Sequence, residues 1–393
     1  MRILTFLHSF EPGGVERVAL RLVRRWRDTG TDALLFMGRT DGALCQELAE
    51  DLAFDSPARR SWAAPFETPW MIIHLIGEIR RTRPDALFCA GNTYTVVAVF
   101  MKLLLGRSCP PILVKVSNDL VRADLKPFAH YWHGRWAWLQ GRLLEGWVIM
   151  HPAMRGEASA ALSRDRLTAI PDPALTAEQL THLRRWSPRA GGATGRRFVA
   201  MGRLAEQKNY PLMLAAFAAG SAPGDVLTIF GEGPCRCELE CLVADLGLTG
   251  RVIFAGHVPD SADSLLDHDI LLLSSAYEGV PAVLVEGLAC GMPIVATDCG
   301  AGVRGLLAVR PDATLVSVDD PAAFARAIAA PPPSEIPPSF DANAYTIEAG
   351  AGAYLAAFAT LLGRAPRLVA VPTQVPVSAA AHSANLLEDR EVA

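Results

Sequence analysis

The amino-acid sequence predicts an α/β protein with two doubly wound, Rossmann-like domains that face each other across a cleft. Its 393 residues exceed what one ordinary hydrophobic core accommodates, which favours two domains. Short apolar runs alternate with longer amphipathic stretches, the pattern of parallel strands joined by crossover helices. A segment rich in Pro, Gly and charge at 171–195 separates two such series.

Each series supplies its own strands. In the first half the predicted strands are residues 2–7, 33–37, 86–89, 112–116, 146–150 and 167–170. In the second half they are residues 198–201, 226–230, 252–255, 270–274 and 293–296. Ligands of such folds bind at the carboxyl ends of the strands.

The predicted organisation follows from these two series. The first domain is expected at 1–172, a linker at 173–195 and the second domain at 196–344. From residue 365 to 393 the chain is rich in Pro, Ala and Ser, which predicts a disordered tail.

Composition and charge narrow the class of protein. A hydrophobic content of 51% and a charged content of 20% are typical of a soluble globular enzyme. The net charge is −4, with a mildly basic first half that suits an anionic membrane or acceptor better than nucleic acid. Eight scattered cysteines favour a reducing cytoplasm, and neither a signal peptide nor a transmembrane helix is predicted.

Two motifs of the second half suit a diphosphate. Gly202 allows close backbone approach, and Arg203 with Lys208 supplies two positive charges. Gly231 and Gly233 follow the next strand in a turn that can cradle a phosphate. The full GxGxxG spacing of a nicotinamide-cofactor site is missing. Taken alone, each motif also fits an ordinary solvated loop.

Two further motifs complete the set. Residues 256–258 (Gly256, His257 and Val258) follow a strand where backbone groups can read the edge of a base. Glu278 precedes a helix that Pro281 opens, and Glu286 lies about 12 Å further along its axis. Carboxylates that far apart cannot share a proton or a metal, but they can bind hydroxyls at the two ends of a nucleoside-diphosphate sugar. The helix N-terminus would face the anion between them.

Together these residues resemble family 4 of the retaining glycosyltransferases, which have the GT-B fold. The resemblance covers residues 197–300 and runs through GRLAEQK, FGEGP, VIFAGHV and SSAYEGVPAVLVEGLACGMPIVATDCG. In the first half, the segment 13–17 (GGVER) resembles the family's glycine loop, which faces the donor phosphates and the acceptor. The resemblance implies a metal-independent hexosyltransferase without a cofactor, which acts on a saccharide or lipid-linked acceptor in bacterial cell-envelope or exopolysaccharide biosynthesis.

The resemblance also implies roles for individual residues. Arg203 and Lys208 would hold the diphosphate, Glu278 would contact the donor sugar and Glu286 the ribose. The first domain would bind the acceptor, and a helix at 345–364 would cross back to it. The donor would be bound by Gly13, Gly14, Gly202, Gly231, Gly233, Gly256, His257, Val258, Gly279, Val280, Pro281 and Glu286.

The sequence departs from the family at an acceptor-side segment. Many members have a histidine where this chain has Ser117. The acceptor-side candidates are therefore Ser117, Asn118 and Asp119, together with Glu16 of the glycine loop. A second departure lies at 300–304, where the family's glycine turn is not followed by a glutamate.

Other functions and ligands remain as alternatives. Another enzyme on the same scaffold, such as a nucleotide-sugar epimerase or a phosphorylase, would need differently placed catalytic groups. A catalytically inactive sugar-binding or scaffold protein is kept open by Ser117. The D-x-D at 267–269 and the cysteines at 235–241 are interpreted as structural, so no metal is predicted.

Two basic, aromatic stretches suggest a membrane surface. Residues 126–142 interleave Phe, Tyr and Trp with cations, and residues 15–27 contain five arginines opposite apolar side chains. Such helices can lie among lipid headgroups on the inner face of the cytoplasmic membrane. The alternative is that their apolar side chains pack into the core of the first domain.

Overall fold

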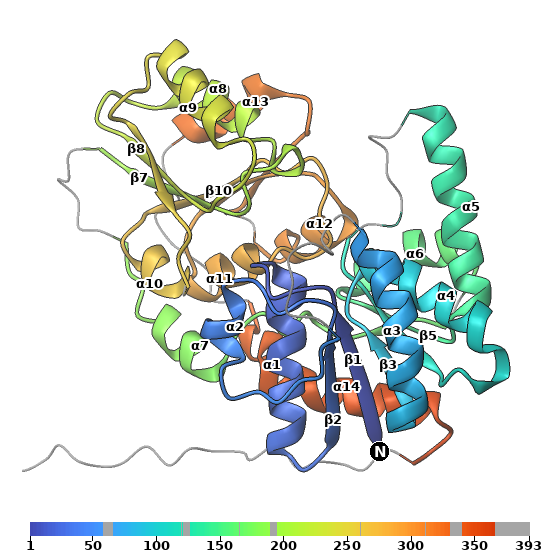
Figure 1. The fold of residues 1–393 in the computed structure, drawn as a ribbon. Helices are drawn as coiled ribbons and strands as arrows, with labels where there is room; N and C mark the ends of the chain where they lie inside the picture. The colour runs from blue at the N-terminus through green and yellow to red at the C-terminus, as the bar shows by residue number, and fades with distance from the viewer. Residues whose placement is uncertain are drawn as a thin grey trace, which may run out of the picture.

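The fold consists of two lobes, each built on a parallel sheet of six strands (Figure 1). This computed structural model describes residues 1–57, 66–118, 120, 126–164, 166–188, 195–259, 261–310, 312–330 and 340–365. The strand orders are β2-β1-β3-β4-β5-β6 and β12-β11-β10-β7-β8-β9. The predicted fold class is therefore confirmed.

All the predicted strands are present. The first sheet consists of β1 (Arg2–Leu7), β2 (Asp32–Met37), β3 (Ala86–Cys89), β4 (Ile112–Val116), β5 (Gly146–Ile149) and β6 (Thr168–Ala169). The second consists of β7 (Arg197–Met201), β8 (Val226–Phe230), β9 (Val252–Gly256), β10 (Ile270–Leu273), β11 (Ile294–Thr297) and β12 (Thr314–Val316). The prediction missed β12, which has three residues and only one buried side chain, so it lacks the apolar run of the central strands.

Helices cover both sheets. The first lobe contains α1 (Gly14–Asp28), α2 (Leu44–Leu48), α3 (Glu67–Thr82), α4 (Thr95–Leu105), α5 (Pro127–Leu143) and α6 (Arg155–Leu162). The second contains α8 (Tyr210–Gly220), α9 (Arg236–Asp245), α10 (Ser261–Leu266), α11 (Ala282–Cys290), α12 (Ala301–Leu307) and α13 (Pro321–Ala329). The helices α7 (Ala177–Leu183) and α14 (Ile347–Leu361) follow the two passages between the lobes. The 3-10 turns are η2 (Asn92–Tyr94), η3 (Gly106–Ser108), η4 (Pro152–Met154), η5 (Glu206–Lys208) and η6 (Ala342–Tyr345).

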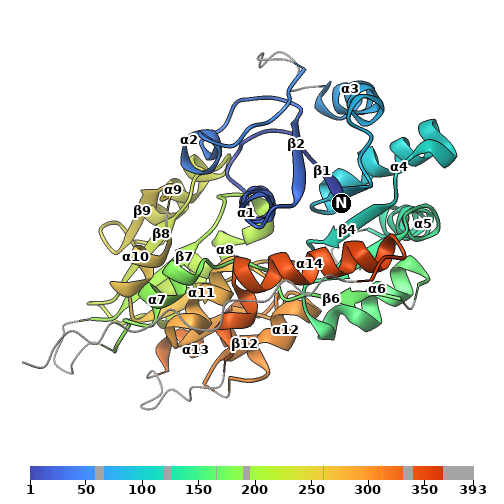
Figure 2. The same ribbon diagram turned by 90° about the horizontal axis from the view of Figure 1, so that it is seen from below.

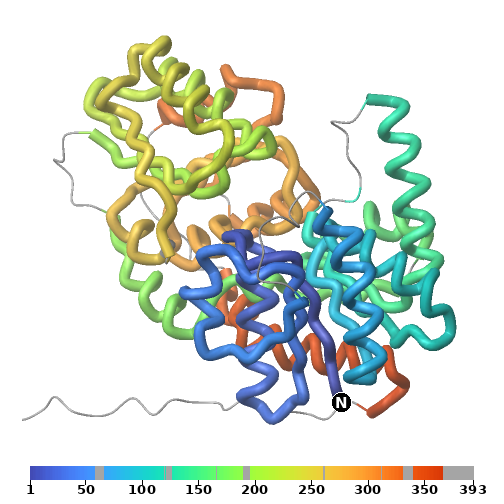
Figure 3. Tube along the Cα trace, in the orientation of Figure 1, coloured from blue at the N-terminus to red at the C-terminus, as the bar shows by residue number. Residues whose placement is uncertain are grey.

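The chain crosses between the lobes at two places that lie side by side. It leaves the first lobe before α7 and returns before α14 (Figure 3). The Leu175 amide donates to the Tyr345 carbonyl at 3.1 Å, and the Ile347 amide donates to the Leu175 carbonyl at 2.7 Å. The two passages therefore form one paired connection. The domain limits given above stay a prediction, and the predicted tail lies outside the described residues except for residue 365.

Helix α14 crosses back to the first lobe and packs beside α1 (Figure 2). The Trp26 indole N–H donates to the Ala351 carbonyl at 3.1 Å. The rings of Tyr354 and Phe358 lie 5.3 and 6.0 Å from that of Phe88 on β3. All four of these aromatic side chains are fully buried. The end of the described chain thus completes the core of the first lobe, as the crossover prediction stated.

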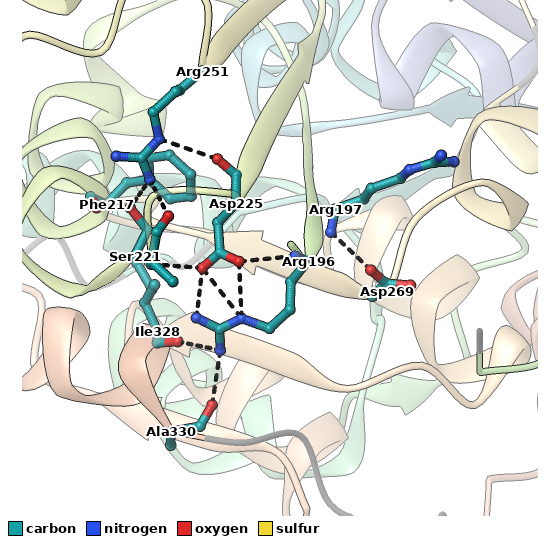
Figure 4. A network of polar contacts seen from close by, with 10 residues as sticks. Arg196, Arg197, Phe217, Ser221, Asp225, Arg251, Asp269, Ile328 and Ala330 are labelled. Atoms are coloured by element: carbon teal, nitrogen blue, oxygen red, sulfur yellow. Dashed lines mark hydrogen bonds and ion pairs between the residues drawn. The ribbon is translucent and has the colours of Figure 1, made fainter. Parts of the chain in front are cut away.

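A buried ionic network fastens the amino-terminal edge of the second sheet (Figure 4). The Asp225 carboxylate accepts from the Arg196 guanidinium at 2.7 Å and from the Arg196 amide at 2.8 Å. Arg196 also donates to the carbonyls of Ile328 and Ala330, which lie at the end of α13. Arg251 donates to the Asp225 carbonyl at 3.2 Å. One carboxylate therefore joins β7, β8 and α13.

Replacing Asp225 by alanine is expected to lower the free energy of unfolding by about 3 kcal/mol, because Arg196 loses its buried partner. Asp225 is 1% exposed. Urea unfolding measures the change, and Asp245→Ala on the exposed end of α9 is the control. An Asp225→Ala protein as stable as this control would contradict the assignment.

The same carboxylate should make stability depend on acid. Burial acts to raise the pKa of Asp225, but hydrogen bonds from Arg196 and from the Ala222 amide bring it below its ordinary value. A carboxyl with a depressed pKa stabilises the fold above its unfolded pKa, near 3.9, and this contribution is lost as pH falls through the folded value. The difference between wild type and Asp225→Ala should therefore shrink below about pH 4.

Candidate active site

A cleft of about 630 Å³ lies between the two lobes. The strand order reverses between β1 and β3 in the first sheet and between β7 and β10 in the second. Loops diverge at such switch points, which leaves a crevice at the carboxyl ends of the strands. Loops that follow β1, β4, β7, β8, β9 and β10 all contribute to the cleft wall.

Most of the predicted site residues meet in this cleft. From the first lobe, its wall includes Gly13, Gly14, Ser117 and Asn118. From the second lobe, it includes Gly202, Arg203, Lys208, Gly231, Gly233, His257, Val258, Glu278, Val280, Pro281 and Glu286. Residues that are distant in sequence therefore converge on one elongated space.

Three of the predicted residues do not line the cleft, and a fourth falls outside the described residues. Gly256 lies behind the wall, where its carbonyl accepts from the Gly231 amide at 2.7 Å. A side chain at Gly279 would come within 2.5 Å of the Ser117 carbonyl oxygen, so this glycine allows the lobes to touch. Glu16 turns toward Tyr94 in the first lobe. Asp119 lies outside the described residues.

Lys208 and Glu278 form an ion pair in the cleft. The Lys208 ammonium lies 2.5 Å from Glu278 Oε1, which also accepts from the Ser275 hydroxyl at 2.9 Å. The exposed fractions of the two charged side chains are 18% and 8%. The sequence interpretation assigned Lys208 to the diphosphate and Glu278 to the sugar, without a contact between them. The pair instead places the ammonium and the carboxylate at one point of the wall.

The glycines that follow β7 and β8 let two loops pack closely. Gly231 has φ +139°, and a side chain there would meet the Gly202 carbonyl oxygen at 2.0 Å. A side chain at Gly233 would meet the Leu204 carbonyl oxygen at 2.3 Å. At Gly202, φ is +154° and a side chain would meet Lys208 Cε at 2.9 Å. Gly231 and Gly233 are therefore required for the close packing of these loops, and Gly202 leaves room for the Lys208 side chain. These requirements come in addition to any contact with a ligand.

Helix α11 points its N-terminus at the cleft. Pro281 is its N-cap rather than a residue of its first turn, and Gly291 ends the helix with φ +80°. The first helical residues, Ala282 and Val283, line the cleft. The first amides of an α-helix have no partner within the helix, so they can bind an anion there. Glu286 lies one turn further on and is 8% exposed.

A buried ion pair on the cleft wall was not predicted. Lys115 at the end of β4 pairs with Asp172, which lies just before the first passage between the lobes. Their exposed fractions are 2% and 5%, and both residues line the cleft. A lysine inside the apolar run ILVKV is the sequence signal that could have revealed this pair.

Glu16 is a first-lobe carboxyl close to these charges. It accepts from the Tyr94 hydroxyl at 2.5 Å. Burial raises the pKa of Glu16 above its ordinary value, while the Tyr94 hydrogen bond and the charges of Lys115 and Arg203 oppose that change. The charges of Lys115 and Arg203 thus favour the ionised form of Glu16, although Glu16 does not line the wall.

Ser117 occupies a crowded position. The Ser117 hydroxyl oxygen accepts a hydrogen bond from the Asn92 backbone N–H at 3.0 Å. The Ser117 backbone N–H donates to the side-chain oxygen Oδ1 of Asn92, also at 3.0 Å. A side chain at Gly91 would lie within 2.9 Å of the Ser117 hydroxyl oxygen. The accepted hydrogen bond leaves the serine O–H able to donate to a ligand. This geometry explains why a small residue follows β4 in this chain.

The D-x-D segment lies at the opposite end of β10 from the cleft. The Asp269 carboxylate accepts from the Arg197 amide at 2.7 Å (Figure 4), and the His268 ring contacts the Ser264 carbonyl. Asp269 therefore holds the amino end of β7. Within the described ranges, we find no group of three or more His, Cys, Asp or Glu side chains placed to hold a metal ion.

The two helices suggested as membrane surfaces differ in how far their apolar side chains are exposed. In α1, Val18, Leu22 and Trp26 lie in the core, which is the packing that the alternative predicts, and Arg24 pairs with Asp51. In α5, the exposed fractions are 78% for Phe128, 61% for Tyr131 and 58% for Trp132. Packing of these aromatics into the core is therefore contradicted. Among the helices in the described parts of the chain, none is both long and apolar enough to cross a membrane.

Comparison with known proteins gives a family match for the second lobe. Residues 195–330 match the family model of the group 1 glycosyl transferases. This part of the chain is therefore similar to the group 1 glycosyl transferases, and the two lobes together have the GT-B fold, as the resemblance implied.

Individual relatives match over part of their length. The lipopolysaccharide core biosynthesis glycosyltransferase LpsE of Rhizobium meliloti is 35% identical over 130 residues, which is 33% of this chain and 37% of LpsE. An N-acetylgalactosaminyltransferase of Campylobacter jejuni, whose acceptor name includes diphospho-undecaprenol, is 32% identical over 122 residues, or 31% of this chain and 33% of that protein. The chain thus matches about a third of the length of these relatives.

Solved structures match over nearly the whole chain. Anabaena Alr3699/HepE in complex with UDP and glucose has a TM-score of 0.63 at 19% identity, covering 93% of this chain and 95% of that one. The lipopolysaccharide outer core galactosyltransferase WaaB has a TM-score of 0.64 at 15% identity, covering 92% and 99%. These similarities concern the fold.

Proposed function

We propose that this protein is a retaining glycosyltransferase that transfers a hexose from a nucleoside-diphosphate sugar to a saccharide or lipid-linked acceptor. The observation that carries the proposal is the convergence of Arg203, Lys208, Glu278, Glu286 and the N-terminus of α11 on one elongated cleft. Cations and free helix amides suit the diphosphate, and the two carboxylates suit hydroxyls on either side of it.

A uridine donor is the first candidate. The HepE structures contain UDP with glucose in one case and UDP-glucose in another. The names of LpsE and WaaB refer to lipopolysaccharide core synthesis, and that of the Campylobacter relative to a lipid-linked acceptor. We therefore propose a UDP-hexose as donor and a role in assembling a cell-envelope polysaccharide at the cytoplasmic side of the membrane.

The proposed chemistry relies on preorganised charge. In a retaining transfer without a protein nucleophile, the acceptor hydroxyl attacks on the face that the diphosphate leaves. Positive charge develops on the sugar ring and negative charge on the departing oxygen. Arg203, Lys208 and the α11 amides would stabilise the diphosphate, and Glu278 would orient both Lys208 and the sugar. The first-lobe loops that carry Ser117 and Asn118 would hold the acceptor.

A panel of nucleotide sugars tests the function. Ligands that bind the folded protein raise its melting temperature, so UDP and one UDP-hexose should stabilise it more than adenosine or guanosine counterparts. Addition of acceptor should then release free UDP. UDP release distinguishes a transferase from an inactive sugar-binding protein. Conversion of the donor sugar without an acceptor would indicate an epimerase. If no nucleotide stabilises the protein, the proposed function fails.

We further propose that α5 rests on an anionic membrane. Figure 1 shows this helix at the edge of the first lobe, with one end extending beyond the neighbouring helices. The same segment carries the exposed cations Lys126, Arg135 and Arg142 as well as the exposed aromatic side chains. Residues 126–144 contain no acidic side chain. Rings in the interface and cations at lipid phosphates would hold the cleft near a lipid-linked acceptor.

Replacing both Phe128 and Trp132 by serine is expected to weaken binding to phosphatidylglycerol vesicles about tenfold, since two interfacial anchors are lost. Flotation of the full chain measures this binding. Ile253→Ser, which removes an apolar side chain 48% exposed on the second lobe, is the matched control. Wild-type protein that stays unbound at every anionic lipid content would overturn the membrane proposal and leave the transferase proposal intact.

A further inference from the structure

A carboxylate from the first lobe holds a cleft loop of the second lobe. Glu47 on α2 accepts from the Arg17 guanidinium at 3.0 Å, and its other oxygen lies 2.9 Å from His257 Nε2. Arg17 also donates to the Pro259 carbonyl at 3.0 Å. We call Glu47, Arg17, His257 and the Pro259 carbonyl the Glu47 clasp. It joins the lobes where Arg17, His257 and Pro259 form part of the cleft wall.

The first-lobe side of the clasp is fixed by its surroundings. The Phe10 amide donates to the Asp41 carbonyl at 2.9 Å, and the Leu44 amide donates to the Phe10 carbonyl at 3.0 Å. Gly42 between them has φ +126°, and a side chain there would meet the Phe10 backbone at 2.0 Å. These contacts tie the start of α2 to the loop that follows β1. These contacts therefore fix the position of Glu47 beside α1. The Glu47 side chain is 15% exposed.

The second-lobe side of the clasp is an edge loop. Strand β9 is the last strand of its sheet, and Gly256 at its end has φ +78°. The pairing of β9 with its neighbour β8 shifts register between Ile229 and Phe230 of β8, which lie opposite the end of β9. An edge loop beside such an irregularity has fewer ladder hydrogen bonds to hold it. The contacts of His257 and Pro259 with the first lobe therefore contribute to its position.

The clasp also connects two proposed parts of the donor site. Arg17 lies in the first turn of α1, where its amide donates to the Gly13 carbonyl at 3.0 Å. Gly13 and Gly14 are proposed to face the diphosphate, and His257 with Val258 to face the base. One carboxylate thus joins the glycine loop of the first lobe to the base-side loop of the second.

We propose that Glu47 is a positioning residue that closes the nucleoside end of the cleft by holding loop 256–259 against α1. This inference rests on the proposed function. With Glu47 in place, the base-side and phosphate-side walls are set before the donor arrives, so less ordering is required on binding. Glu47 does not touch the reacting atoms, so it should govern donor affinity rather than the chemical step.

Glu47→Ala and the isosteric Glu47→Gln are expected to raise the KM for the nucleotide sugar about fivefold with kcat within twofold, as for loss of a part-exposed ion pair. The exposed Glu50, three residues along the chain, supplies the control Glu50→Ala. Glu47→Asp should recover part of the affinity. Amide hydrogen exchange at 256–258 should be faster in Glu47→Ala than in wild type, a readout that requires no turnover.

A double-mutant cycle with His257→Ala tests the contact itself. Because each substitution removes the same pair, the two effects on KM should be markedly less than additive. Fully additive effects, or unchanged exchange at 256–258 in Glu47→Ala, would overturn the clasp. If UDP stabilises wild type and Glu47→Ala equally, the clasp is wrong and the transferase proposal stands. Failure of every nucleotide to stabilise wild type would instead refute the proposed function.

Discussion

Arg203→Ala is expected to lower kcat by about 10² to 10³-fold and to change the donor KM by less than about threefold. Arg203 follows β7 at the switch point of its sheet and lines the cleft. An arginine guanidinium can bind two phosphate oxygens at once through its planar fork of N–H donors. Negative charge on the diphosphate grows as the sugar leaves, so Arg203 should stabilise the transition state more than the bound donor.

Steady-state kinetics with varied donor separates these effects. Arg203→Lys keeps the charge but loses the fork of donors, so it should recover only part of the rate. Arg197→Ala is the matched control, because Arg197 opens the same strand at the end away from the cleft. A variant in which only KM rises would show that Arg203 contributes uniform binding, and the role assigned to it would be wrong.

Glu278→Gln is expected to lower kcat/KM about 10²-fold, the second largest effect. The substitution keeps the shape of a side chain that is 8% exposed. It removes the charge that holds the Lys208 ammonium at 2.5 Å and accepts from Ser275. Lys208 would then lose its orientation, and the proposed sugar hydroxyl would lose a charged acceptor.

The ion pair between Lys208 and Glu278 leads to a second, more specific prediction. Lys208→Met alone should cost about as much as Glu278→Gln, and the double variant little more than either, because the two side chains act as one unit. Glu238→Gln on the exposed face of α9 controls for removal of a carboxylate elsewhere. Independent effects that multiply in the double variant would contradict a catalytic role for the Lys208–Glu278 pair.

The fold was predictable mainly because the central strands of both sheets are buried on both sides. Runs such as that of β1, with five of six residues buried, are read directly from the sequence. The loops at the carboxyl ends of such strands then converge on one cleft. Strand β12 lacks that apolar run, and its place in the sheet depends on pairing with β11. Sequence periodicity carries no information about such pairing.

The sequence motifs predicted many of the residues that line the cleft but not the contacts between them. Motifs at strand ends placed Arg203, Lys208 and Glu278 in the cleft, yet the pair between the last two joins residues 70 apart. Glu47 contacts a histidine 210 residues away, and nothing in the neighbourhood of Glu47 marks it. Such contacts arise from the way the lobes dock, which no local pattern encodes.

The return of α14 to the first lobe sets an order of events during synthesis. Trp26 and Phe88 belong to the first quarter of the chain, but Tyr354 and Phe358, which cover them, are among the last described residues. The amino-terminal lobe therefore leaves the ribosome with an open apolar face. It can reach its final packing only after the second lobe has been translated, so a nascent chain stalled before residue 347 would expose that face to chaperones and proteases.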